Sequence, residues 1–256
     1  MSRADWRSPG AYEELRSLDA LGFAWEFLRR NPDFQRDRGK LERAARRGTL
    51  NQAKVDAFAR RWGCDFAGAA DTSDPTSVLW AVQALPTVIA LTRFPVDLAD
   101  PGHQLPSLPL DSSVGVDGAE QLIERRGALF RIHLDNGGIR APAVLLPLDQ
   151  FFDIRVTAAI RLWRGLTGRN PGPNPAALPK TRRDRLILAL RALDGRLEDA
   201  TYREIASVLF GEASLSDRGW KSHDLRDRTI RLVRFGLGLM HSGYRRLLLY
   251  PYRRHS

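Results

Sequence analysis

Basic side chains collect near the C-terminus, in a spacing that suits contact with a polyanion. Several arginines lie on the outer side of a predicted helix that runs from about His223 to His241. A guanidinium group can hold a phosphate or a guanine through two parallel hydrogen bonds, and the first turns of a helix can enter the major groove. We therefore expect DNA contacts here. His223 and Arg226 are predicted to meet base edges, and the residues predicted to meet phosphates are Lys221, Ser222, Arg228 and Arg231.

A shorter helix that begins at about Thr201 should hold this arginine-bearing helix in place. Thr201 is a candidate N-cap and Glu204 follows three residues later, which is the spacing of a capping box. Gly211 can open the turn that ends the helix, as in the first helix of a helix-turn-helix. Tyr202 and Arg203, at the start of this shorter helix, are predicted to add contacts to the DNA backbone.

The predicted turn between the two helices is longer than a helix-turn-helix normally allows. About ten residues separate Gly211 from Ser222, which we expect to cap the second helix, where three or four are usual. The pattern predicts a variant with an expanded turn or with a short inserted helix at Leu215–Trp220. The alternative is a three-helix bundle whose arginine face is merely solvated.

An enzymatic interpretation also has to be weighed. His223 and Arg226 form an HxxR pattern, and His241 and Tyr250 follow at positions that invite comparison with tyrosine recombinases. The 18 positions from His223 to His241 leave little room for the helices that separate these residues in such enzymes. We therefore expect no catalytic residues and regard a recombinase as a remote alternative.

Charge is distributed unevenly along the 256 residues, whose formal net charge is +10. Residues 1–63 carry a net charge of +5, residues 64–154 a net charge of −7, and residues 155–256 a net charge of +12. Such asymmetry is typical of chains with a polyanion-binding module. Because arginine enrichment also follows from a GC-rich genome, the location of the charge is more informative than its total.

Several classes of protein are excluded by composition. Cys64 is the only cysteine, the five histidines are scattered without an HExxH motif, and no GxxxxGK or GxGxxG motif occurs. We expect no metal site and no cofactor. No apolar run is long enough to cross a membrane, and the N-terminus lacks the apolar core of a signal peptide. A cytoplasmic protein with no membrane partner is therefore expected.

Periodicity predicts an α+β chain with three segments. Residues 1–68 should form a helical module, residues 69–169 a central region with a small antiparallel β-hairpin, and residues 170–256 an all-α helix-turn-helix variant. One helix or a pair of short helices is predicted at 11–28. Further helices are predicted at 40–62 (with a break near Gly48), 151–166 and 180–193, the last closed by Gly195. Strands are predicted at 78–82 and 87–94, and Asn136-Gly137 should turn a hairpin between 129–134 and 139–146.

Two long stretches resemble a known family. Residues 6–34, with Trp6, Tyr12-Glu-Glu-Leu15 and Gly22-Phe-Ala-Trp-Glu-Phe-Leu-Arg-Arg-Asn-Pro-Asp-Phe34, resemble a proteobacterial transcriptional-regulator-like domain. Residues 193–248, with Tyr202-Arg-Glu-Ile-Ala206, Trp220-Lys-Ser222 and Leu225-Arg-Asp-Arg-Thr-Ile-Arg-Leu-Val-Arg234, resemble the DNA-binding domain of RovC-like transcription factors.

This resemblance implies a regulator that binds double-stranded DNA, and most simply an activator of type VI secretion or mobile-element genes. It implies that Lys221, Ser222, Arg226 and Arg228 lie at the start of the recognition helix. RNA polymerase or another regulator is a further candidate partner, and we expect a homo-oligomer. Because some family members bind another regulator, a protein-interaction module or antiactivator is the alternative.

Overall fold

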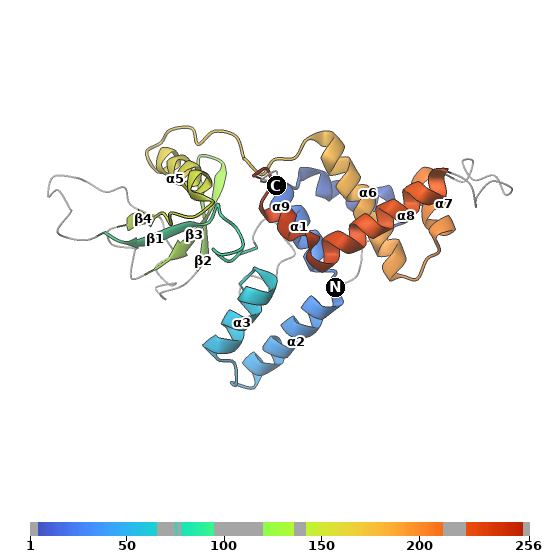
Figure 1. Ribbon diagram of the computed structural model, residues 1–256, viewed down its shortest axis with the longest axis horizontal. Helices are drawn as coiled ribbons and strands as arrows, with labels where there is room; N and C mark the ends of the chain where they lie inside the picture. Colours follow the sequence, from blue (N-terminus) through green and yellow to red (C-terminus); the bar gives the residue numbers. More distant parts are fainter. Residues whose placement is uncertain are drawn as a thin grey trace. The chain divides into compact units, whose positions relative to one another are not determined.

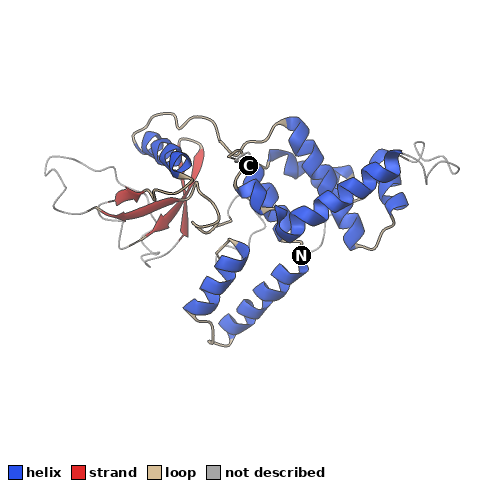
Figure 2. Cartoon of the chain, viewed as in Figure 1, coloured by secondary structure: helices blue, strands red, loops and turns tan. Residues whose placement is uncertain are grey.

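The computed structural model describes residues 5–65, 75, 78–94, 120–135, 142–211 and 224–252 (Figure 1). The chain divides into two compact units, one formed by residues 1–35 with 176–250 and the other by residues 36–175 with 251–256. Figure 2 shows helices in both units and a single small sheet in the second. The predicted α+β class is confirmed. The segments 1–68, 69–169 and 170–256 were predicted from the periodicity of the sequence, and that division stays a prediction.

The first unit is built entirely from helices in its described part. Its N-terminal portion contributes the 3₁₀ helix η1 (Pro9–Ser17) and α1 (Ala20–Leu28). Its C-terminal portion contributes α6 (Lys180–Leu197), α7 (Tyr202–Phe210), α8 (Asp224–Gly238), the π-helix η5 (Leu239–Gly243) and α9 (Arg245–Leu248). No described helix of the chain is both long and apolar enough to span a bilayer.

The predicted helix over 11–28 is divided at Asp19. The Asp19 carboxylate accepts hydrogen bonds from the backbone N–H groups of Leu21 and Gly22, both at 3.0 Å, and so caps α1. Every residue of α1 is buried. A helix that is apolar on all sides needs neighbours all round, and α1 packs against α6, η5 and α9. The N-terminal residues therefore form the centre of the unit that carries α7 and α8.

A buried ion pair fixes α1 against α6. Arg30 donates from Nε to one oxygen of Asp194, at 2.6 Å, and from Nη2 to the other, at 2.8 Å. Glu26 accepts from Nη1 of Arg30 at 2.6 Å, and the Tyr12 hydroxyl donates to Asp194 at 2.6 Å. Asp194 is fully buried and Arg30 is 6% exposed. Tyr12 lies in η1, Glu26 in α1 and Asp194 in α6, while Arg30 follows α1 by two residues. The four side chains form one hydrogen-bonded network.

Both the arginine and the tyrosine of this network are held in their protonated forms. Burial alone would lower the pKa of Arg30, but the hydrogen bonds and charges of Asp194 and Glu26 more than compensate, so that the pKa is raised. Burial first, and the negative charge of Asp194 second, raise the pKa of Tyr12 well above its usual value. Tyr12 therefore remains a hydrogen-bond donor to Asp194 throughout the physiological pH range.

Gly195 has a different role from the predicted one. We expected it to cap the C-terminus of a helix ending near 193, but α6 continues to Leu197 and Gly195 is buried inside it. A Cβ at this position would lie 3.1 Å from the Trp6 ring and 3.2 Å from Ile205. Glycine is needed here because α6 passes close to the N-terminal segment and to α7. Sequence periodicity does not distinguish this close packing from a helix end.

The second unit begins with a helical hairpin. It consists of α2 (Pro32–Arg46), whose first residues belong to the first unit, and α3 (Gln52–Trp62). The predicted break near Gly48 is confirmed, but α2 starts at Pro32 rather than near residue 40. Asn31 explains the early start, because its side-chain oxygen accepts hydrogen bonds from the backbone N–H groups of Asp33 and Phe34. Proline is well suited to the first turn of a helix capped in this way.

The sheet of the second unit has the strand order β2-β3-β1-β4. The strands are β1 (Ile89–Arg93), β2 (Glu120–Arg125), β3 (Ala128–Leu134) and β4 (Pro142–Leu145). The predicted hairpin between 129–134 and 139–146 is wrong, because β1 lies between β3 and β4, parallel to β3 and antiparallel to β4. The hairpin in the structure joins β2 to β3 through Arg126 and Gly127, both with positive φ. Residues 136–140, including the predicted turn, lie outside the described part.

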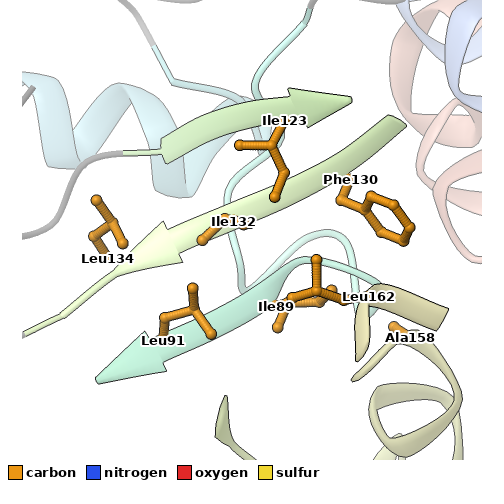
Figure 3. Close-up of a cluster of buried hydrophobic side chains, with 8 residues drawn as sticks. All are labelled: Ile89, Leu91, Ile123, Phe130, Ile132, Leu134, Ala158 and Leu162. Carbon is orange, nitrogen blue, oxygen red and sulfur yellow. The ribbon is translucent and has the colours of Figure 1, made fainter. Parts of the chain in front are cut away.

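Two further strand predictions have different outcomes. The strand predicted at 87–94 is confirmed as β1, whereas 78–82 forms no strand and only Trp80 makes an isolated bridge, to Cys64. The predicted helix at 151–166 is confirmed as α5 (Phe152–Leu166). This helix covers one face of the sheet, where its Ala158 and Leu162 join a buried cluster with β1, β2 and β3 (Figure 3).

The buried ion pair yields a first prediction. Asp194→Asn removes the carboxylate that accepts two of the Arg30 hydrogen bonds and leaves that charge with Glu26 alone. Breaking a buried pair typically costs about 3–5 kcal/mol. Urea unfolding followed by tryptophan fluorescence should show that loss. The matched control is Asp184→Asn on the same helix, because Asp184 pairs with Lys180 and Arg16 at the surface. Equal losses in the two variants would show that the buried pair has no special importance.

Candidate nucleic-acid interface

The start of α7 has the local structure that the sequence predicts. The Thr201 hydroxyl accepts from the backbone N–H of Glu204 at 3.2 Å, and a Glu204 carboxylate oxygen accepts from the backbone N–H of Thr201 at 2.7 Å. The backbone N–H of Thr201 first, and second its hydroxyl, which donates to the same Glu204 carboxylate at 2.8 Å, hold the pKa of Glu204 below its usual value. The capping box is confirmed. It fixes the first turn of α7, where Tyr202 is half-buried and Arg203 is exposed.

The outer face of α8 carries a row of exposed arginines. Arg228, Arg231 and Arg234 are all exposed and recur every third residue, so that they form a slanting row along the helix. Residues 229, 233 and 236, which are buried, lie on the opposite side. We call Arg228, Arg231 and Arg234 the arginine row. Its position opposite the buried side makes it an outward-facing cationic surface.

Arg226 does not belong to this row. On a helix of about 100° per residue, Arg226 lies roughly 140° around the axis from Arg231. It is exposed, and its guanidinium group is 4.0 Å from the Asp227 carboxylate. Asp224 and Asp227 both lie in the first turn of α8, where they interact favourably with the helix dipole. The first turn thus has a different charge character from the row that follows it.

Aromatic rings hold several arginines around α8 in place. The Arg228 guanidinium lies 4.6 Å from the centre of the Phe210 ring, at the end of α7. The Arg185 guanidinium of α6 lies 4.7 Å from the Phe235 ring, which comes one turn after Arg231 on α8. Arg185 thereby extends the cationic surface from α8 to α6. We call the arginine row together with Arg185 the candidate interface.

Sequence reasoning assigned no contact to Arg185 or to Arg182. Arg182 lies 4.3 Å from the ring centre of Tyr250, three residues before Arg185 on α6. The alternation of arginines with buried leucines on this helix was visible in the sequence. The rings that the arginines contact are some 50 to 70 positions away, however, and no local pattern indicates them.

Three predicted contact residues lie outside the described part of the chain: Lys221, Ser222 and His223. The predicted cap at Ser222 and the short helix at Leu215–Trp220 also fall there. The structure therefore brings together Arg228 and Arg231 on one face of α8, places Arg226 on another, and leaves Tyr202 and Arg203 at the start of α7. Of the residues invoked for a recombinase, His241 contacts the Leu237 carbonyl and Tyr250 packs on Arg182.

Close packing at Gly236 sets the position of α8. A Cβ on Gly236 would lie 2.8 Å from the backbone oxygen of Ala189 and 3.1 Å from the Cβ of Leu193, both on α6. Only glycine allows the two helices to approach this closely. The inward-facing Thr229 hydroxyl donates to the Leu225 carbonyl at 2.7 Å and so needs no partner across the interface. The arginine row is thus supported by a tightly packed pair of helices.

Two segments of the chain match the models of known domain families. Residues 5–67 match the model of a proteobacterial transcriptional regulator-like domain, and residues 145–249 match that of a DNA-binding domain of type VI secretion transcription factors. The chain therefore has the domains of a DNA-binding transcriptional regulator. The second model is the RovC DNA-binding domain, so the resemblance predicted from the two ends of the sequence is confirmed. No curated protein matches the sequence significantly.

Packing at Gly236 yields a second prediction. Gly236→Ala forces α6 and α8 apart and should destabilise the first unit by about 1–3 kcal/mol, the usual cost of overpacking. Gly238→Ala is the matched control, since its Cβ would meet no atom within 4 Å and alanine favours a helix by up to about 1 kcal/mol. Thermal unfolding by circular dichroism compares them. A Gly236→Ala melting temperature equal to or above that of Gly238→Ala would contradict the close packing.

Proposed function

We propose that this chain is a cytoplasmic, sequence-specific regulator that binds double-stranded DNA through a helix-turn-helix variant and activates transcription. The observation that carries the proposal is the coincidence of two facts. Residues 145–249 match a DNA-binding family, and the same segment presents the candidate interface on α6 and α8. The family matches point to a non-enzymatic role, which weighs against the recombinase alternative.

In this proposal α7 and α8 are the two helices of the motif. Both pack on α6, α7 begins with a fixed capping box, and α8 presents its arginine row to solvent. Residues 211–223 would form the expanded turn. We assign Tyr202 and Arg203 to the DNA backbone, in keeping with their place in the first turn of α7.

Charge suggests how the contacts on α8 are divided. Asp224 and Asp227 in the first turn repel phosphates, so phosphate binding falls to Arg228, Arg231 and Arg234 further along. The residues at the start of α8 are then the ones available to contact base edges. We assign Arg226 and His223 to bases, and Lys221 and Ser222 to the phosphates that flank the entry of the helix into the groove. Arg185 adds a phosphate contact from α6.

The regulated genes and further partners belong to the same proposal. The family to which residues 145–249 are similar is named for type VI secretion, and we propose that secretion or mobile-element genes are the targets. RNA polymerase or another regulator would contact the N-terminal or the central part of the chain. A chain that only binds another regulator is the alternative, and it would show no affinity for DNA.

A salt titration provides the test and the third prediction. Binding of the full chain to a fluorescent double-stranded DNA of random sequence should weaken with salt at a slope of about −5 to −7 in a log–log plot, as six to eight phosphate contacts require. Arg231→Ala/Arg234→Ala should reduce the magnitude of that slope by about 2, since each phosphate contact contributes about 0.9.

The control variant also removes two positive charges, but from helices outside the candidate interface. Arg46→Ala/Arg60→Ala takes two exposed arginines from α2 and α3 and should leave the slope within about 0.5 of the wild-type value. If both double variants reduce the slope equally, the candidate interface is not where DNA binds. If the wild-type chain binds neither random DNA nor any genomic fragment, the interaction module replaces the DNA-binding regulator.

Arg226 allows the fourth prediction, which concerns sequence specificity. A binding site is first selected from a random pool with the wild-type chain. Arg226→Ala should then weaken binding to the selected site by about 1–3 kcal/mol and relax the preference at one base pair. Arg231→Ala is the comparison, because a phosphate contact weakens all sequences alike. A uniform loss in Arg226→Ala would reassign this residue to the backbone.

A further inference from the structure

Helix α5 has two apolar faces, and the sheet covers only one of them. Ala158, Leu162 and Gly165 are buried on the face turned toward the sheet, as Figure 3 shows for the first two. A helix that packs on one side of a sheet normally has a polar outer face. The exposed side of α5 carries the polar residues Asp153, Thr157 and Arg164, but also the large apolar side chains of Ile160 and Trp163, which raises the question of what covers these two.

The outer face carries a stripe of large side chains at helical spacing. Ile160 is 45% exposed and Trp163 is 48% exposed, while Val156 and Ala159 are half-buried between them and the start of the helix. Phe152 completes the spacing of i, i+4, i+7, i+8 and i+11 that a helix–helix contact requires. We call these residues the α5 stripe: Phe152, Val156, Ala159, Ile160 and Trp163. Exposed apolar patches of this kind on a folded chain mark interaction sites.

Two charged side chains beside the α5 stripe indicate that its partner is a second copy of the chain. Asp153 and Arg164 are exposed, lie on the same flank of the α5 stripe, and stand about three helical turns apart, one near each end of the helix. When two identical helices pair antiparallel about a two-fold axis, each end meets the opposite end of its partner on the same flank. Asp153 of one copy would then face Arg164 of the other, and the same pair would occur a second time.

We propose that the α5 stripe is a dimerisation surface that binds the α5 stripe of a second copy of this chain in antiparallel orientation. At the offset that brings Asp153 opposite Arg164, the large apolar side chains of the two stripes alternate along the contact rather than coincide. Such alternation is how side-chain ridges of one helix fill the grooves of another. The contact uses residues of the second unit alone and does not require DNA.

Sedimentation velocity of the DNA-free full chain over a concentration series tests the surface. The wild-type chain should show a reversible monomer–dimer equilibrium, and Ile160→Glu should abolish the dimer, because it places a charge in the middle of the stripe. Arg60→Asp on α3 changes charge at a distant exposed position and should leave the equilibrium unchanged. A wild-type chain that stays monomeric, or a dimer that survives Ile160→Glu, would overturn the proposal.

A charge exchange tests the orientation and gives the fifth prediction. Asp153→Arg and Arg164→Asp each turn two attractive pairs into two repulsive ones and should raise the dimer dissociation constant roughly tenfold. The double exchange in one chain should restore it to within about twofold, and a mixture of the two single variants should form mixed dimers. Circular dichroism confirms that each variant is folded. Failure of both combinations to recover association would exclude the antiparallel pairing, whether or not the chain binds DNA.

Discussion

The architecture of the first unit depends on one buried ion pair, between Arg30 and Asp194. Removing two charges from water is costly, and the cost is offset only when geometry and additional hydrogen bonds are good. Here Asp194 accepts two hydrogen bonds from the guanidinium group and one from Tyr12, while Glu26 holds the remaining side of Arg30. A one-turn slip of α1 along α6 would leave the Asp194 charge buried without a partner and Arg30 with Glu26 alone. The pair therefore sets the register of the helix on which α7 and α8 are built.

Because of this ion pair, the N-terminal segment has a structural role in the unit that carries the C-terminal helices. Residues 5–67 match one family model and 145–249 another, yet the first 35 residues fold with the C-terminal helices. Trp6 donates to Glu198 at 2.9 Å, and Asn31 donates to the Met240 carbonyl in η5 at 3.1 Å. The N-terminal segment is thus part of the core that supports the arginine row. A fragment that begins near residue 170 would lack α1 and expose the apolar faces of α6 and α9.

Local signals in the sequence were sufficient for much of the helical structure and for little of the sheet. The capping box at Thr201, the break near Gly48 and helix α5 all follow from neighbouring residues, and all were predicted. The strand order could not be, because β1 pairs with β3 across a separation of some 40 residues and its presence there separates β3 from β4. Gly195 was misread for a related reason, since the Trp6 ring that explains it is 189 positions away. At the candidate site the sequence identified the arginines of α8, but it did not show that Arg226 lies on a different side of the helix from Arg228 and Arg231.

The stacked arginines give the candidate interface a physical property that charge alone does not. A guanidinium group that lies on an aromatic ring uses its flat face for the ring and keeps its in-plane N–H groups for acceptors. In the candidate interface, Arg185 and Arg228 lie over the rings of Phe235 and Phe210. Ordering a long side chain before binding removes part of the entropy cost that binding would otherwise carry. In the proposed complex, a phosphate would therefore meet donors already oriented by the helical core. The rings, and through them the packing of α6, α7 and α8, would then contribute to affinity.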